Sequence, residues 1–148
     1  MKNLNMYLKA LFNAILFLVV TFQPVKSAIT QEQMEKMAKS MRASCLQKID
    51  TTEELVSGIR RGEFPDDYNL QCYTNCIMKA MRSFRNGNID FNMIKKQIDA
   101  VMPPDIGARL KKAVMSCNNI EFDTDPCKMS YQYVQCIYHA DTEIFFFP

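Results

Sequence analysis

Histidine and glycine are scarce in this 148-residue sequence, which has one histidine, His139, and four glycines. A Ser-His-Asp site would have to use His139, and no nucleophile-elbow motif is present. The sequence also lacks a phosphate loop, an EF-hand loop and the H-E-x-x-H zinc motif. Small secreted phospholipases A2 need a His-Asp pair and a glycine-rich calcium loop, whereas Ala140 follows His139 here. We therefore expect no catalytic site, no metal site and no cofactor.

The sequence also has no apolar run of the about 20 residues that a membrane span requires. The apolar run over residues 10–20 is shorter and is interrupted by Asn13. Basic residues precede it, and small residues follow it near Ser27, as is typical of a secretory signal peptide. We predict a signal peptide over residues 1–27 and a secreted, extracellular domain over residues 28–148, with no membrane span in the mature chain.

An excess of basic charge is missing once this segment is set aside. Residues 1–27 contain Lys2, Lys9 and Lys26 and no acidic side chain, so the remainder has 15 basic and 16 acidic side chains and a net charge of −1. Nucleic-acid binding requires a basic surface. The charge balance therefore gives no support to a nucleic-acid partner.

Alternating polar and apolar runs long enough for a β-strand are absent, whereas helical spacing of apolar residues recurs throughout. We expect an all-α domain of six short helices, over residues of about 30–49, 51–61, 68–85, 90–102, 105–117 and 125–139, followed by a tail over residues 141–148. Thr51 and Glu54 have the spacing of a capping box. We expect Asp105 to cap the fifth helix and Asp125 to cap the sixth.

Six cysteines lie in the expected secreted domain, which indicates three disulfide bonds. A zinc site would require paired C-x2-C spacing, which the sequence lacks. Six cysteines allow many pairings, and counting alone does not choose among them. Disulfides would stabilise helices that are individually of marginal length.

Methionine is frequent in the expected secreted domain, and phenylalanine is concentrated at its C-terminal end. Nine methionines follow residue 27. Such flexible side chains suit a surface that adapts to varied ligands, although methionine at helical spacing also serves as ordinary core filling. The tail ends with Phe145, Phe146 and Phe147, a group that should not stay in water. The tail therefore closes over a cavity, straps a solid core or docks a partner.

The cysteine spacing C-x26-C-x3-C-x40-C-x9-C-x8-C resembles that of the six-cysteine insect odorant-binding proteins. Residues 70–76, Met102-Pro103-Pro104 and the aromatic tail ending in proline are similar to further features of that family. The resemblance implies an all-helical fold around an internal apolar pocket, stapled by three disulfides. It also implies the pairs Cys45–Cys76, Cys72–Cys127 and Cys117–Cys136.

The same resemblance implies which residues bind ligand. By position they are Met78, Met81, Ser83, Phe84, Ile94, Ile98, Val114, Tyr131, Val134, Ile137, Phe145, Phe146 and Phe147. Ser83 stands where some members of the family carry a hydroxyl that bonds an alcohol ligand. Phe147 stands where some carry tryptophan, so an indole donor is missing there. Met34, Met37 and Met41 are further candidates.

The function implied is a secreted carrier that binds small hydrophobic molecules, such as odorants or pheromones, and delivers them through aqueous fluid. Its place would be the sensillar lymph, with an olfactory receptor as a further partner. The alternative is a secreted, disulfide-rich interaction protein that docks a receptor or partner through its aromatic tail. His139 stands at the start of that tail, either as a pH-sensitive trigger of release or as an exposed histidine at a helix end.

Overall fold

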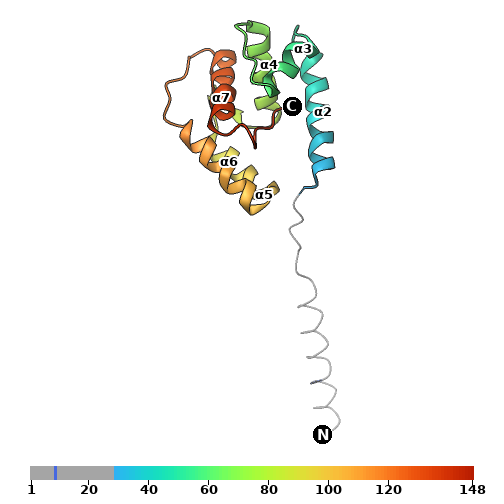
Figure 1. Cartoon of the computed structure of the whole chain (residues 1–148), viewed down its shortest axis with the longest axis vertical. Helices are drawn as coiled ribbons and strands as arrows, with labels where there is room; N and C mark the ends of the chain where they lie inside the picture. The colour runs from blue at the N-terminus through green and yellow to red at the C-terminus, as the bar shows by residue number, and fades with distance from the viewer. Residues whose placement is uncertain (1–8, 10–28) are drawn as a thin grey trace.

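The structure, a computed structural model, describes Lys9 and residues 29–148 (Figure 1). The expected signal peptide therefore lies outside the described residues, apart from Lys9. Within residues 29–148 the chain forms six helices and one short hairpin. The elements are α2 (Gln31–Leu46), α3 (Glu53–Arg60), α4 (Tyr68–Ala80), β1 (Phe84–Arg85), β2 (Asn88–Ile89), α5 (Phe91–Val101), α6 (Pro104–Ser116) and α7 (Pro126–Ala140). The all-helical prediction is confirmed.

The first two helices begin at threonine caps. The Thr30 hydroxyl accepts the Gln33 N–H at 3.2 Å, and the Gln33 side chain accepts the Thr30 N–H at 2.9 Å. In α3 the cap is Thr52, which accepts the Leu55 N–H. The predicted capping box between Thr51 and Glu54 is therefore wrong by one residue. Thr52 is the residue that adopts the extended backbone that a cap requires.

The predicted continuation of α4 to Arg85 is also wrong. The helix ends at Ala80, and Arg82 follows with a φ of 57°, which no helix interior allows. The chain then reverses through Asn86 and Gly87, both with positive φ, so that Phe84 pairs with Ile89 in a two-stranded antiparallel hairpin. Such a turn favours glycine and asparagine. The hairpin buries Phe84 and Ile89 on its inner side.

Helices α5 and α6 begin differently. Asp90 caps α5 by accepting the Met93 N–H at 2.8 Å. Helix α6 has no side-chain cap: Pro103 is the cap residue and Pro104 the first helical residue. The prediction that Asp105 caps this helix is therefore wrong. Pro104 favours the first turn of the helix because the φ of proline is already close to the helical value. Asp105 lies within that turn.

Asp125 caps α7, as the sequence predicts, by accepting the N–H groups of Cys127 and Lys128. The Lys128 N–H, together with the Tyr68 hydroxyl, lowers the pKa of Asp125 below its usual value. A carboxylate with a lowered pKa adds stability that is present at neutral pH and is lost as the pH falls through that pKa.

We therefore expect Asp125→Ala to lower the thermal unfolding midpoint at pH 7 and to flatten its decline below about pH 4. Circular dichroism melts at several pH values measure both effects. Asp105→Ala is the matched control, because Asp105 lies in a first turn without a side-chain cap. Equal midpoints for the two variants at pH 7 would contradict the role given to Asp125.

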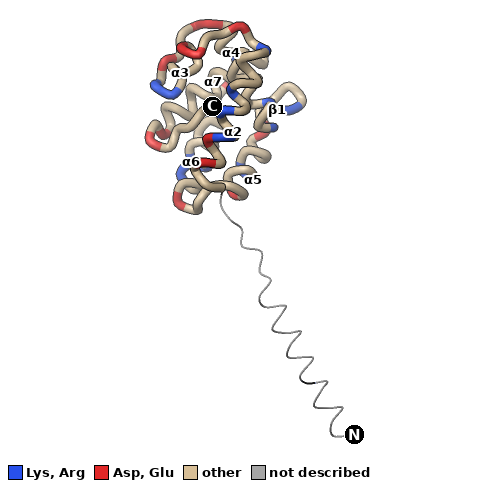
Figure 2. Tube along the Cα trace, turned by 90° about the vertical axis from the view of Figure 1, so that its right-hand side faces the viewer, with Lys and Arg blue, Asp and Glu red and all other residues tan. Residues whose placement is uncertain are grey.

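Helices α4 and α7 pack along each other and form the centre of the domain (Figure 1). Two of the three disulfides fix α2 and α6 to this pair, and the third joins α4 to α7. Cys45–Cys76 joins α2 to α4, Cys72–Cys127 joins α4 to α7, and Cys117–Cys136 joins the end of α6 to α7. This is the pairing that the family resemblance implies. Figure 2 shows charges of both signs distributed over the tube, with Lys and Arg beside β1.

Candidate functional site

The interior enclosed by α4, α5, α6 and α7 is apolar. In the described residues, the buried polar side chains are Gln71, Thr74, Asn75, Ser83 and Ser130, and none of them is ionisable. Burying a charged ligand without a partner costs far more than burying a neutral one. The described residues bury no Asp, Glu, Lys, Arg or His side chain, and the buried titratable groups are the tyrosines Tyr73, Tyr131 and Tyr133.

Most residues expected to bind ligand meet in this interior. Met78, Phe84, Ile94, Ile98, Val114, Tyr131, Val134, Ile137 and Phe147 belong to one hydrophobic cluster, and Met81 and Phe145 pack against it. Ser83 is buried as well. Phe146 is the exception, with 40% of its surface exposed. The structure thus brings together four helices, the hairpin and the tail around one apolar centre.

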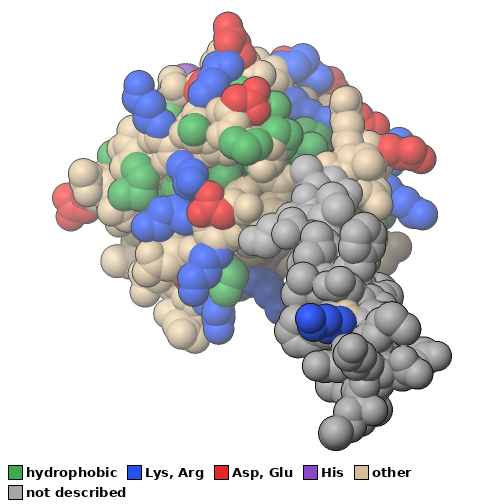
Figure 3. Space-filling model, turned by 90° about the horizontal axis from the view of Figure 1, so that it is seen from below, with side chains coloured by type: hydrophobic (Ala, Val, Ile, Leu, Met, Phe, Trp, Pro, Cys, Tyr) green, Lys and Arg blue, Asp and Glu red, His purple; other side chains and the backbone are tan. Residues whose placement is uncertain are grey.

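Helix α2 contributes less than its methionines suggest. Met41 packs against the cluster, whereas Met37 is 53% exposed. Figure 1 shows the N-terminal half of α2 standing clear of α5 and α6. On the face seen in Figure 3, hydrophobic side chains lie in small groups between charged ones. In the half of α2 that includes Met37, Ala38 is buried and Met37 faces solvent.

The tail lies across the interior and is held at its far end. The Arg60 Nε donates to the Phe147 carbonyl oxygen at 2.6 Å, and the Arg60 guanidinium lies 4.7 Å from the centre of the Phe146 ring. The buried Tyr73 hydroxyl donates to a Pro148 oxygen at 3.0 Å. Phe147 packs edge-on against Tyr73, with ring centres 6.5 Å apart. Burial raises the pKa of Tyr73 to about 12, so its hydroxyl stays a donor.

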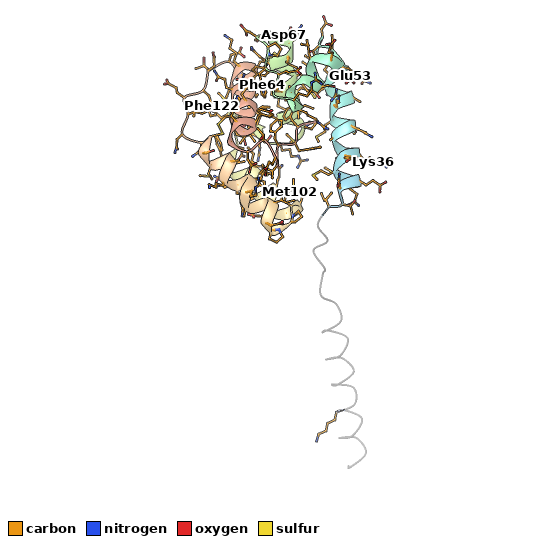
Figure 4. All side chains as sticks on the ribbon, in the orientation of Figure 1. Lys36, Glu53, Phe64, Asp67, Met102 and Phe122 are labelled. Atoms are coloured by element: carbon orange, nitrogen blue, oxygen red, sulfur yellow. A yellow bond between two sulfur atoms is a disulfide. The ribbon has the colours of Figure 1, made fainter. Side chains whose placement is uncertain are left out.

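The beginning of the tail is held by charge. Arg109 of α6 donates to both carboxylate oxygens of Asp141, at 2.8 and 3.1 Å, and to Glu143 at 2.9 Å. The hydrogen bonds that Glu143 and Asp141 accept from Arg109 raise the pKa of Arg109. His139 is exposed beside Phe64 and Tyr138. Figure 4 shows Phe64 lying against α7, where it meets Tyr131 and Tyr138 edge-on.

These holding residues were missed at the sequence level. Arg60, Tyr73 and Arg109 lie 87, 75 and 32 positions from the tail groups they bind. No periodicity or motif connects residues so far apart, and an arginine on a short helix is more often a solvated charge. Only the measured contacts identify them.

Two hollows lie at the surface rather than in the interior. One, of about 570 Å³, lies between the hairpin turn, the start of α5 and the end of α6, and Phe91 and Lys95 are among its lining residues. The other, of about 690 Å³, lies beside α3 and the loop that contains Phe64. None of the residues expected to bind ligand lines either one. Their assignment to the ligand therefore stays a prediction.

The described residues contain neither a metal-binding cluster nor a membrane-spanning helix. Within Lys9 and residues 29–148, no group of three or more His, Cys, Asp or Glu side chains is placed to hold a metal ion. No helix in that part of the chain is both long enough and apolar enough to span a bilayer. All six cysteines are in disulfides.

Known proteins are similar to this chain in both sequence and fold. A model of the PBP/GOBP family matches residues 27–140. General odorant-binding protein 72 of Anopheles gambiae is 30% identical over 122 residues, which cover 82% of this chain and 100% of that protein. The structure of Apis mellifera odorant binding protein 5 has a TM-score of 0.79 and 56% identity, and covers 82% of this chain and 100% of its own. Odorant Binding Protein 4 of Chrysopa pallens has a TM-score of 0.75 and 30% identity, and covers 81% and 99%.

Proposed function

The chain belongs to the PBP/GOBP family, and we propose that it is a secreted carrier that binds small hydrophobic molecules of the odorant or pheromone class and delivers them through aqueous fluid. The observation that carries the proposal is the apolar interior, in which the described residues bury no Asp, Glu, Lys, Arg or His side chain, and which is crossed by a tail held through Arg60 and Tyr73. Such an interior offers solvation to a neutral apolar molecule and no chemistry to transform it.

The expected affinity follows from buried area. A ligand that buries about 300 Å² of apolar surface gains roughly 7–8 kcal/mol at about 25 cal/mol per Å². Immobilising the ligand and ordering side chains subtracts several kcal/mol from this. We therefore expect micromolar dissociation constants and a broad range of ligands, with the residues named above as the proposed contacts.

The orientation of the tail favours a carrier over a docking protein. Phe147 is buried, and Phe145 packs edge-on against Tyr138 with ring centres 5.1 Å apart. Two of the three phenylalanines therefore face the domain, which leaves only Phe146 for an external partner. Secretion, residence in the sensillar lymph and delivery to an olfactory receptor are parts of the proposal that follow from the family.

Native mass spectrometry tests the proposal most directly. We expect the protein of residues 28–148, with its disulfides intact, to retain one molecule of a neutral apolar ligand such as a long-chain alcohol. An alkyltrimethylammonium ion of similar length is the control, because a buried cation would have no counter-charge in the interior. Retention of no neutral ligand from a varied panel, or equal retention of the cation, would rule out this carrier function.

A further inference from the structure

Most buried hydroxyl groups of the domain already take part in hydrogen bonds within the protein. The Tyr73 hydroxyl donates to the tail, the Ser83 hydroxyl to the Met78 oxygen at 2.9 Å, and the Tyr131 hydroxyl to the Pro65 oxygen at 2.7 Å. Ser130 accepts from an asparagine at 2.8 Å. Because its proton already goes to Met78, the Ser83 hydroxyl has only acceptor capacity left for a ligand.

Tyr133 differs from all of these. It is only 7% exposed, yet its hydroxyl makes no hydrogen bond to any described residue. The fully enclosed side-chain atoms without a partner in the same residues are Thr51 Oγ1 and Gln71 Oε1, so the Tyr133 oxygen still borders space. Burial raises the pKa of Tyr133, which keeps the phenol neutral and able to donate. Its oxygen keeps accessible surface and its proton is not committed to a protein acceptor, so a ligand acceptor that reaches it would gain a hydrogen bond.

The position of Tyr133 places this donor among the proposed ligand contacts. On α7 it precedes Val134 and lies one turn before Ile137, so the three share one side of the helix. Its ring packs edge-on against Phe91 at the start of α5, with centres 5.7 Å apart, and against Phe122 at 6.4 Å. Figure 4 labels Phe122 beside α7. The surrounding rings are apolar, so the hydroxyl is the polar group of its neighbourhood.

We propose that Tyr133 is a specificity-determining residue that donates a hydrogen bond to the ligand, and that preferred ligands are apolar molecules with one neutral acceptor oxygen, such as ketones, aldehydes, esters or alcohols. This inference rests on the proposed carrier function and adds a ligand class to it. The family resemblance gave the polar role to Ser83, because of its position in the sequence.

Two pairs of shape-matched probes test the inference. Acetophenone and α-methylstyrene differ only in the exchange of a carbonyl oxygen for a CH2 group, as do the larger benzophenone and 1,1-diphenylethylene. Their dissociation constants are measured by displacement of a fluorescent apolar dye. In Tyr133→Phe we expect the ketones to bind about 3- to 10-fold more weakly and the alkenes to stay within about twofold of wild type.

Tyr68→Phe is the matched control, because it removes a tyrosine hydroxyl that is already bonded within the protein, to Asp125 at 3.2 Å, and Tyr68 lies outside the proposed ligand contacts. It should lower the thermal midpoint while leaving the ketone-to-alkene ratio unchanged, whereas Tyr133→Phe should keep or raise the midpoint. Infrared spectra of carbonyl-labelled benzophenone give an independent signature. The carbonyl stretch of the bound ketone should lie at lower wavenumber in the wild type than in Tyr133→Phe.

The outcomes separate the two proposals. If the wild type binds the probes and the ketone-to-alkene ratio is the same in Tyr133→Phe, the role of Tyr133 is wrong and the carrier function stands. If the wild type binds none of the four probes and no ligand in the mass-spectrometric panel, both proposals fail together. The inference is supported if ketones bind more weakly relative to alkenes in Tyr133→Phe than in the wild type, and if the carbonyl stretch of the bound ketone is shifted to lower wavenumber in the wild type alone.

Discussion

Replacing Cys72 and Cys127 together by serine is expected to lower the free energy of unfolding by about 4 kcal/mol, the largest stability loss among the variants considered. The two residues are separated by 55 positions, and their bond ties together the central helices α4 and α7. In the loop-entropy model a longer closed loop gives more stabilisation, because the unfolded chain loses more freedom. Total stabilities of domains are about 5–15 kcal/mol, so this loss approaches global unfolding at body temperature.

Urea titration followed by circular dichroism measures the loss. The matched control replaces Cys117 and Cys136, whose separation is only 19 positions. The same model gives about 3 kcal/mol for this shorter loop. A loss for Cys72 and Cys127 that is smaller than the loss for the control pair would contradict the assignment of α4 and α7 as the centre of the domain.

Deleting residues 144–148 is expected to weaken the binding of a fluorescent apolar probe by about tenfold or to remove its selectivity. Phe147 is buried against Tyr73, and a buried ring contributes roughly 1.5–3 kcal/mol. A loss of about 1.4 kcal/mol is already tenfold in a dissociation constant. Titration with the probe, and competition with ligands of different length, measures affinity and selectivity together.

Phe146→Ala is the control for this deletion, because its side chain is 40% exposed and is not part of the buried cluster. We expect its effect on affinity to stay within about twofold, since an exposed ring buries little further area. Phe147→Ala should reproduce most of the loss caused by the deletion. Unchanged affinity and selectivity after the deletion would remove the tail from the ligand site.

Much of the fold could be predicted because it depends on local features. The helices follow from apolar spacing, and the start of α7 follows from Asp125 before Pro126. Errors occurred where a local signal had two interpretations. Met81 to Arg85 has helical composition, and only the left-handed backbone at Arg82 shows that the chain has already left the helix. Thr51 and Thr52 are adjacent threonines before the same helix, and the structure shows that Thr52 is the one that accepts the Leu55 N–H.

The candidate site also contains residues that could be predicted from the sequence and residues that could not. Ile94 and Ile98 share a face of α5 by periodicity, so their burial was predictable. The residues that hold the tail act across long separations in sequence, and no pattern connects Arg60 with Phe147. The state of a hydroxyl is also invisible in the sequence. The Ser83 hydroxyl donates to the Met78 oxygen, whereas the Tyr133 hydroxyl makes no hydrogen bond to a described residue.

The contacts that hold the tail have a consequence for how this protein can diversify. Arg60 and Tyr73 bind main-chain oxygens of Phe147 and Pro148, and such oxygens are present whatever side chain a residue carries. The side chain of residue 147 can therefore change in size or shape while the fastening persists. In the proposed carrier, attachment of the tail and selectivity for ligand therefore depend on different groups. Single substitutions in the tail can change ligand preference while the hydrogen bonds that attach the tail remain.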